Sequence, residues 1–232
     1  MPFAQYLISL LPTLFLSVPI VLFSLSAHEL SHGYAAYRLG DPTAKRYGRL
    51  SLNPLRHLDP LGALCMVFFR FGWAKPVPID CRYFKNPKRD MAITALAGPL
   101  TNLVLSVLFG GIAAGIECVY PILTISGGEV VSVLFSWIYT FFHLAHTMNL
   151  YLAVFNLIPI PPLDGSRILF AFLPTRYYFK VMRYERYIHL FLLVLIYFGF
   201  VDGFLSSLVQ PISEAIFFVF FRLFYWVLSL LF

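Results

Sequence analysis

Charged residues are scarce in this sequence. Only 12% of its 232 residues are Asp, Glu, Lys or Arg, whereas a soluble domain carries about 25%. Hydrophobic residues make up 59% of the chain, and the mean hydropathy is +0.78. This composition excludes an ordinary soluble globular protein. We expect about four to six membrane spans joined by short loops, without room for a large domain outside the membrane.

Cysteine is equally scarce. The three cysteines, Cys65, Cys81 and Cys118, are odd in number and contain no C-x-x-C pair. These spacings argue against a disulfide framework and against a thiolate metal site. A basic n-region is also absent from the first ten residues, MPFAQYLISL. We therefore expect a retained first span rather than a cleaved signal peptide.

Basic residues are missing from most of the chain and concentrated in two stretches. Of the 17 Lys and Arg residues, eleven lie between Arg38 and Arg89 and five between Arg167 and Arg186. This clustering is typical of cytoplasmic loops. It places residues 38–91 and 158–186 in the cytoplasm and residues 118–129 outside. The net charge of +6 then indicates topology and contact with a lipid bilayer, whose headgroups can be anionic, and no nucleic-acid partner.

The long apolar segments predict an all-α polytopic membrane protein with about five transmembrane helices in a single membrane-embedded domain, residues 1–232. The expected spans are residues 7–39, 92–117, 130–157, 187–209 and 212–232. Between the first two lies LGALCMVFFRFGWAKPVPID, residues 61–80. Its apolar part is too short to span and is rich in aromatic residues and Val. It therefore predicts a short β or re-entrant segment.

The first span contains a polar stretch, SAHELSHG at residues 26–33, and polar residues inside a membrane are usually functional. His28 and His32 are four positions apart, so on a helix they share one face about 6 Å apart in rise. Two imidazoles so placed can bind one Zn²⁺. Glu29 can then serve as the general base of a metalloprotease. The alternative is a pair of histidines in a polar helix interface.

A catalytic zinc site needs a third protein ligand, and Asp164 is the candidate. It lies in NLIPIPPLDGSR, residues 156–167, where three prolines end the preceding helix and Gly165 adds backbone freedom. The side chain is therefore presented from irregular backbone on the same side of the membrane as the end of the first span. The alternative is a helix-capping Asp.

HELSH on a membrane helix followed by N-x-x-P-x-x-x-L-D-G resembles the site-2 protease family of intramembrane zinc metalloproteases, in its small bacterial-type branch. Four further stretches look similar: NPLRHLDPLG (53–62), FGWAKPVP (71–78), LAGPLTN (96–102) and FNLIPIPPLDG (155–165). The resemblance implies His28, His32 and Asp164 as ligands of one Zn²⁺ and Glu29 as catalytic base. It also implies that Asn156 stabilises the developing oxyanion.

The implied substrate is a membrane protein or signal-peptide remnant whose transmembrane helix unwinds locally. The implied location is a bacterial plasma membrane, with the active site near the cytoplasmic side. Residues 63–71 are expected to offer a strand edge that pairs with the extended substrate. Three polar residues are possible supports around the metal: His57, Asp59 and Asn102. His57 and Asp59 alternatively belong to a structural turn, and Asn102 to a bond between helices.

Two rival sites and one non-catalytic role remain open from the sequence. A membrane di-iron oxidase would use His28, His32, His143, His146 and His189, although no H-x-x-H-H motif is present. A prenyl-protein endopeptidase would take its third ligand from Glu185 instead of Asp164. A transporter or scaffold would leave the H-E-x-x-H motif and the Asp unexplained. For His143 and His146, bonding between helices is the simpler interpretation.

The topology is testable with single cysteines introduced at Ser126 and Lys45 of a variant in which the three native cysteines are replaced by serine. An impermeant thiol reagent added to intact cells should label the Ser126 position and leave the Lys45 position unlabelled, because the basic loops stay inside. Permeabilised cells, in which both positions should react, are the control. Labelling of the Lys45 position from outside would overturn this orientation.

Overall fold

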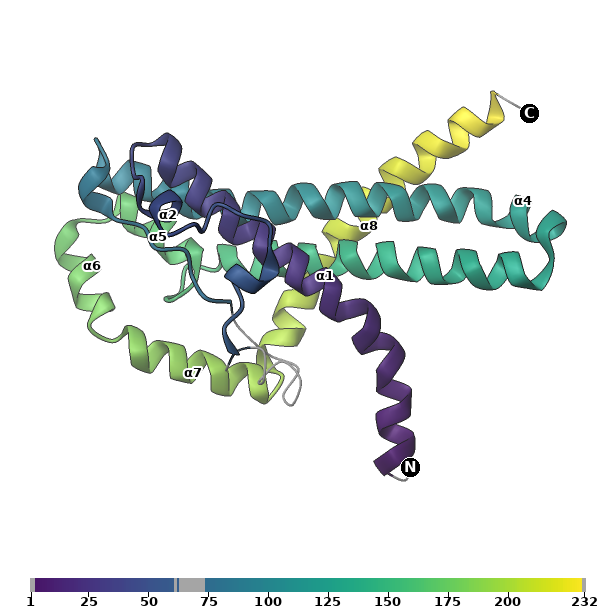
Figure 1. Cartoon of the computed structure of the whole chain (residues 1–232), viewed down its shortest axis with the longest axis horizontal. Helices are drawn as coiled ribbons and strands as arrows, with labels where there is room; N and C mark the ends of the chain where they lie inside the picture. Colours follow the sequence, from purple (N-terminus) through teal and green to yellow (C-terminus); the bar gives the residue numbers. More distant parts are fainter. Residues whose placement is uncertain (1–2, 61, 63–73, 231–232) are drawn as a thin grey trace. The chain divides into compact units, whose positions relative to one another are not determined.

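The structure, a computed structural model, describes residues 3–60, 62 and 74–230. Helices dominate it (Figure 1). They are α1 (Phe3–Arg38), α2 (Thr43–Arg46), η1 (Pro54–Arg56), η2 (Cys81–Tyr83), α4 (Pro87–Leu157), α5 (Asp164–Phe172), α6 (Thr175–Met182), α7 (Glu185–Tyr197) and α8 (Phe200–Ser229). The only β pairing within the described residues is an antiparallel bridge between Leu58 and Ala74.

α4 is two helices joined at a sharp reversal. Gly128 has φ 70° and ψ −171°, a backbone conformation that glycine adopts without steric penalty. Figure 1 shows the helix doubling back there. The two arms, Pro87–Pro121 and Gly128–Leu157, agree with the expected second and third spans.

Three helices of the described chain are long and apolar enough to cross a membrane: the two arms of α4, and α8 over Phe200–Ser229. A 30-residue helix is about 45 Å long, more than the roughly 30 Å hydrocarbon core of a bilayer. The expected total of about five spans is not established by these helices. A span in α1 stays a prediction.

The C-terminal helices differ from the expected spans. We expected one span to end at residue 209 and the next to begin at residue 212, but α8 continues through this point, which includes Pro211. The break lies instead at Gly199, with φ 75°, where a left-handed residue ends α7. α7 has only 13 residues, about 20 Å, and is therefore shorter than a bilayer core. Proline inside an apolar helix is tolerated when neighbouring groups satisfy the freed carbonyl.

The expected β or re-entrant segment is only partly described. Residues 61 and 63–73, which include the proposed strand edge at 63–71, lie outside the described residues. Residues 74–80 belong to no helix or strand apart from the bridge at Ala74. The β segment is thus not confirmed.

The chain forms two compact units. One comprises Met1–Val21, Leu103–Tyr151 and Ser206–Phe232, and the other Leu22–Asn102 and Leu152–Leu205. We call them the hairpin unit and the site unit. The prediction of a single membrane-embedded peptidase domain stays a prediction, and each unit is described by itself.

In the hairpin unit, α8 packs against the first arm of α4 through glycines. A Cβ on Gly111 would lie 3.0 Å from the ring of Phe220, and one on Gly115 would lie 3.2 Å from the ring of Phe224. Small residues allow this close approach, which is a common means of helix association in membranes.

His146 joins three parts of the hairpin unit. Its fully buried ring is 3.0 Å (Nδ1) from the hydroxyl of Ser106 and 2.8 Å (Nε2) from that of Ser213. The expected bonding between helices is therefore observed for His146. His143 is exposed and contacts the ring of Phe217.

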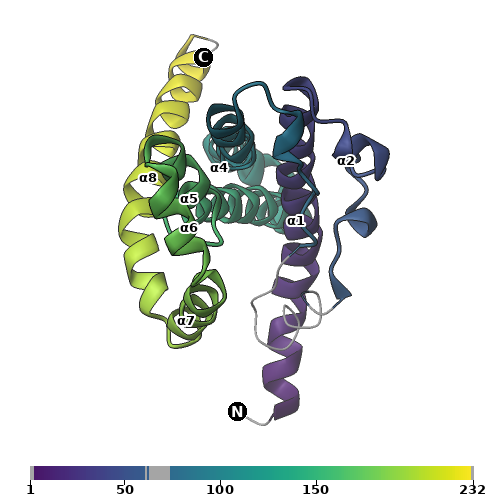
Figure 2. The same cartoon turned by 90° about the vertical axis from the view of Figure 1, so that its left-hand side faces the viewer.

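In the site unit, the second half of α1 packs closely on the beginning of α4. Ser24 and Ser26 on α1 are buried, and the hydroxyl of Thr101 on α4 donates to that of Ser31 at 2.7 Å. α2 lies on another side of the same part of α1, where Ala44 approaches Gly33 (Figure 2). Other elements thus cover two sides of this half of α1.

Candidate metal centre

α1 presents His28 and His32 on one face, as their spacing predicts. The exposed fractions of the two residues are only 5% and 6%. Both lie in an uninterrupted helix, so the four-residue spacing directs the two rings to the same place. Their rings are edge to face, with centroids 4.5 Å apart.

Asp164 reaches the histidines from the first position of α5. α4 ends at Leu157, and the proline-rich loop leads directly into α5. The next residue, Gly165, holds this start of α5 against the end of α4. A Cβ there would lie 2.5 Å from the carbonyl oxygen of Ile158 and closer still to that of Leu157. Because a side chain at this position would meet rigid backbone, glycine is required for Asp164 to be placed here.

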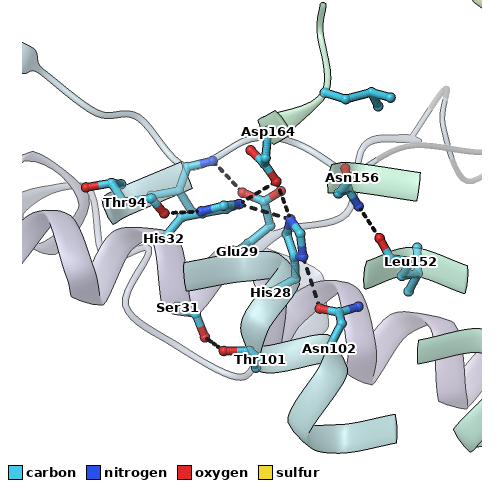
Figure 3. A network of polar contacts seen from close by, with 12 residues as sticks. His28, Glu29, Ser31, His32, Thr94, Thr101, Asn102, Leu152, Asn156 and Asp164 are labelled. Carbon is cyan, nitrogen blue, oxygen red and sulfur yellow. Dashed lines mark hydrogen bonds and ion pairs between the residues drawn. The ribbon is translucent and has the colours of Figure 1, made fainter. Parts of the chain in front are cut away.

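Three ligand atoms converge (Figure 3). Oδ2 of Asp164 is 3.1 Å from Nε2 of His28 and 3.2 Å from Nε2 of His32, and the two Nε2 atoms are 2.9 Å apart. Among the side chains that the structure describes, these three form the only cluster with metal-ligand chemistry. All three residues are buried.

The outer nitrogens of the two rings have their own partners. Nδ1 of His28 is 3.0 Å from Oδ1 of Asn102, and Nδ1 of His32 is 2.7 Å from the backbone carbonyl oxygen of Thr94. Since both partners accept hydrogen bonds, each Nδ1 carries the proton and each Nε2 directs its lone pair at the cluster. This is the arrangement that metal-ligating histidines require.

Gly98 on α4 provides the space for the two rings. A Cβ on this residue would lie 2.6 Å from Nε2 of His28 and would also collide with Nε2 of His32. The glycine therefore lets α4 lie directly against the convergent nitrogens.

The donor set fits a zinc ion. Ligands about 2.0–2.1 Å from a tetrahedral Zn²⁺ lie about 3.3 Å from one another, and the three observed separations of 2.9–3.2 Å are close to this value. Two imidazoles and one carboxylate are also a ligand set of catalytic zinc, which leaves a fourth position open.

Glu29 lies beside the cluster without belonging to it. One carboxylate oxygen, Oε2, accepts a hydrogen bond from the backbone N–H of Val77 at 2.8 Å. The side chain is half-buried, so it is neither a solvated surface charge nor a ligand.

Comparison with known proteins agrees with this geometry. The model of peptidase family M50 matches residues 17–199, most of the chain. The chain belongs to peptidase family M50. Among its relatives, YwhC of Bacillus subtilis (strain 168) is 38% identical over 193 residues, which cover 83% of this chain and 84% of YwhC.

Two further relatives match over shorter regions. Rip2 of Mycolicibacterium smegmatis is 31% identical over 150 residues, covering 62% of this chain and 52% of Rip2. MJ0611 of Methanocaldococcus jannaschii is 41% identical over 154 residues, covering 65% of this chain and 71% of MJ0611. The names of all three relatives assign them provisionally as zinc metalloproteases. No solved structure matches the chain significantly.

These findings establish the site-2 protease resemblance and make Zn²⁺ the cofactor of this M50 member. Its apolar helices make it an integral membrane protein. The assignment of individual residues to zinc and to catalysis rests on the geometry above.

The remaining site candidates occupy different places. Oδ1 of Asn102 contacts Nδ1 of His28, and its role as a support around the metal stays a prediction. The side-chain amide of Asn156 donates to the carbonyl oxygen of Leu152, one turn earlier in its own helix, and points to no member of the cluster (Figure 3).

His57 and Asp59 belong to a turn. The ring of His57 is buried, with Nε2 2.7 Å from the carbonyl oxygen of Ser51. Oδ1 of Asp59 accepts a hydrogen bond from the backbone N–H of Gly62. In the described part of the chain neither side chain contacts the cluster of His28, His32 and Asp164. The contacts of both residues are those of a structural turn.

The rival ligands lie elsewhere. Glu185 lines a cavity of about 460 Å³, beside Arg167 and Met182, and none of the three cluster residues lines it. His189 is exposed on α7. Among the described side chains, no second group of metal ligands forms around these histidines or Glu185, so a di-iron centre and a Glu185 ligand have no structural support.

The supporting roles of three groups could not be predicted from local sequence. The Thr94 carbonyl and the Val77 N–H are backbone atoms, which are present at every position and carry no sequence signal. Gly98 lies in LAGPLTN, a motif recognised from the family, but its steric role depends on which helix packs against it.

We predict that Gly98→Ala loses zinc while the protein still folds, because the added methyl group forces the two imidazoles apart. Zinc affinity should fall at least about tenfold, the usual effect of disturbing the support of a ligand. Metal analysis after equilibration with a zinc buffer measures this. Gly203→Ala is the matched control, since a Cβ on this helical glycine meets nothing within 4 Å. Equal zinc affinity in the two variants would refute the steric role of Gly98.

Proposed function

We propose that this M50 member is an intramembrane zinc endopeptidase. It hydrolyses peptide bonds in or near the transmembrane segments of membrane proteins or signal-peptide remnants. The observation that supports this most directly is the buried convergence of His28, His32 and Asp164 beside Glu29, in a chain built of membrane-length helices.

His28, His32 and Asp164 hold the metal ion. When bound, zinc acts as a Lewis acid that polarises the scissile carbonyl and lowers the pKa of water to about 7. Asn102 and the Thr94 carbonyl keep the two histidines in the tautomer that binds through Nε2. The chain thus supplies three ligands and leaves one side of the site for water and substrate.

Glu29 is the general base. It accepts a proton from the attacking water and later delivers this proton to the leaving amine, a role that needs a carboxylate within hydrogen-bond reach of both. Its position next to His28 in sequence, outside the ligand cluster, suits this role.

Asn156 is the candidate donor for the developing oxyanion. Its amide nitrogen now donates to the Leu152 carbonyl oxygen, which already accepts a helical hydrogen bond in α4. Rotation of the side chain would therefore release the amide for a substrate without leaving a carbonyl unsatisfied. Donors that are directed at the oxyanion typically contribute about 10²–10³ to the rate.

The substrate is a membrane helix that unwinds locally, because an amide within an intact helix is shielded by its own hydrogen bonds. The basic stretches at 38–91 and 158–186 favour access from the cytoplasmic side of a bacterial plasma membrane. The alternative functions, a di-iron oxidase and a non-catalytic scaffold, have no comparable observation in their favour.

The test compares Glu29→Gln with Asp164→Ala. Glu29→Gln should retain zinc and lose about 10²–10⁴-fold in cleavage of a model single-span membrane protein, as expected for removal of a general base. Asp164→Ala should lose both zinc and activity, because two ligands remain. Metal content and cleavage in detergent measure the two effects.

Glu185→Ala is the matched control and should keep zinc and activity. Near-normal cleavage by zinc-loaded Glu29→Gln would exclude the proposed role of Glu29. Zinc retention in Asp164→Ala together with zinc loss in Glu185→Ala would exclude the proposed ligand set.

A further inference from the structure

Residues 74–80, AKPVPID, run beside the catalytic part of α1. Two prolines, Pro76 and Pro78, flank Val77. Proline lacks an N–H, so Val77 has the only backbone donor among these three residues. Each proline also favours an extended conformation in the residue that precedes it. The tripeptide therefore presents one N–H from stiff, extended backbone, and this N–H donates to Oε2 of Glu29.

Hydrogen bonds on both sides fix the position of this donor. The N–H of Lys75 donates to the carbonyl oxygen of His57 at 2.7 Å, next to the bridge that pairs Leu58 with Ala74. The N–H of Asp80 donates to Oδ2 of the buried Asp41, also at 2.7 Å. The Val77 N–H therefore lies between two anchored positions.

This segment packs on α1 at Gly33. Gly33 lies one helical turn after Glu29, so both residues share a face. A Cβ on Gly33 would lie 3.1 Å from Cγ1 of Val77, 3.2 Å from Cβ of Ala44 and 2.8 Å from Cδ2 of Leu50. The missing side chain lets Val77, whose exposed fraction is 7%, pack directly on the helix. This explains the glycine that ends SAHELSHG.

We propose that the backbone N–H of Val77 is a positioning group for the catalytic base. It holds one oxygen of Glu29 and leaves the other oxygen to receive the proton from water. The inference rests on the proposed function, in which Glu29 is the base, and adds the group that orients it.

The physical need for such a group is clear. A glutamate has three side-chain torsions, and a base must lie within about 2.6–3.2 Å of the proton that it takes. A displacement of about 1 Å in a catalytic group can lower the rate about 10²-fold. A donor on anchored backbone removes this freedom without adding a second charge to an apolar site.

The first experiment measures the hydrogen bond itself. Hydrogen–deuterium exchange of the full-length zinc enzyme in detergent, resolved to single residues, should show a protected Val77 amide. Glu29→Ala should accelerate exchange at Val77 at least tenfold. The Asp80 amide is the internal control and should not change, because its acceptor is Asp41. Unchanged protection of Val77 in Glu29→Ala would overturn the proposal.

The second experiment removes the donor. Val77→Pro keeps extended backbone but lacks the N–H, and kcat should fall about 10–100-fold while KM and zinc content stay near their wild-type values. Ile79→Pro is the matched control, because its N–H has no acceptor among the described residues. It should cleave like wild type. Val77→Ala, which keeps the N–H, should have a kcat at least tenfold above that of Val77→Pro.

A double-mutant cycle separates positioning from a general structural effect. In single-turnover reactions, Val77→Pro should lower the rate of Glu29→Gln by less than threefold, because the base on which it acts is already absent. An equal loss in both backgrounds would overturn the inference. Wild-type activity of Glu29→Gln would instead refute the proposed function, so the two failures are distinguishable.

Discussion

The site unit depends on one demand: two histidines and a carboxylate must meet within 3.2 Å inside an apolar protein. Nothing in a bilayer interior can hydrate such groups, so each needs a partner from the chain or a metal ion. This demand brings the start of α5 and the start of α4 against one face of α1. The other packing features of the unit follow from how closely these elements must approach.

Three glycines allow these elements and side chains to approach one another closely. Gly98 admits the two imidazoles, Gly165 holds Asp164 against the end of α4, and Gly33 receives Val77. In each case a single methyl group would displace a group that the proposed chemistry uses. Glycine lowers helix stability by about 1 kcal/mol relative to alanine. At these three positions the packing that it permits outweighs this intrinsic penalty.

The sequence predicted the parts of the site that depend on local spacing. The four-residue spacing of His28 and His32 directs both rings to one face of any helix. The prolines before Asp164 end a helix whatever surrounds them. Helix boundaries that depend on packing are harder to predict from the sequence. The expected spans place a break between residues 209 and 212, yet α8 runs through this point and the chain breaks at Gly199. Backbone partners such as the Val77 N–H depend on tertiary contacts that no spacing records.

Backbone groups orient two of the key side chains, the Thr94 carbonyl for His32 and the Val77 N–H for Glu29. Such groups have an advantage in a membrane protein. A side chain that served the same purpose would add a polar group that must itself be satisfied when no substrate is bound. A peptide group is present in any case, and anchored backbone holds it without further torsional freedom. The site can therefore orient a proton acceptor with one segment of chain and no additional buried charge.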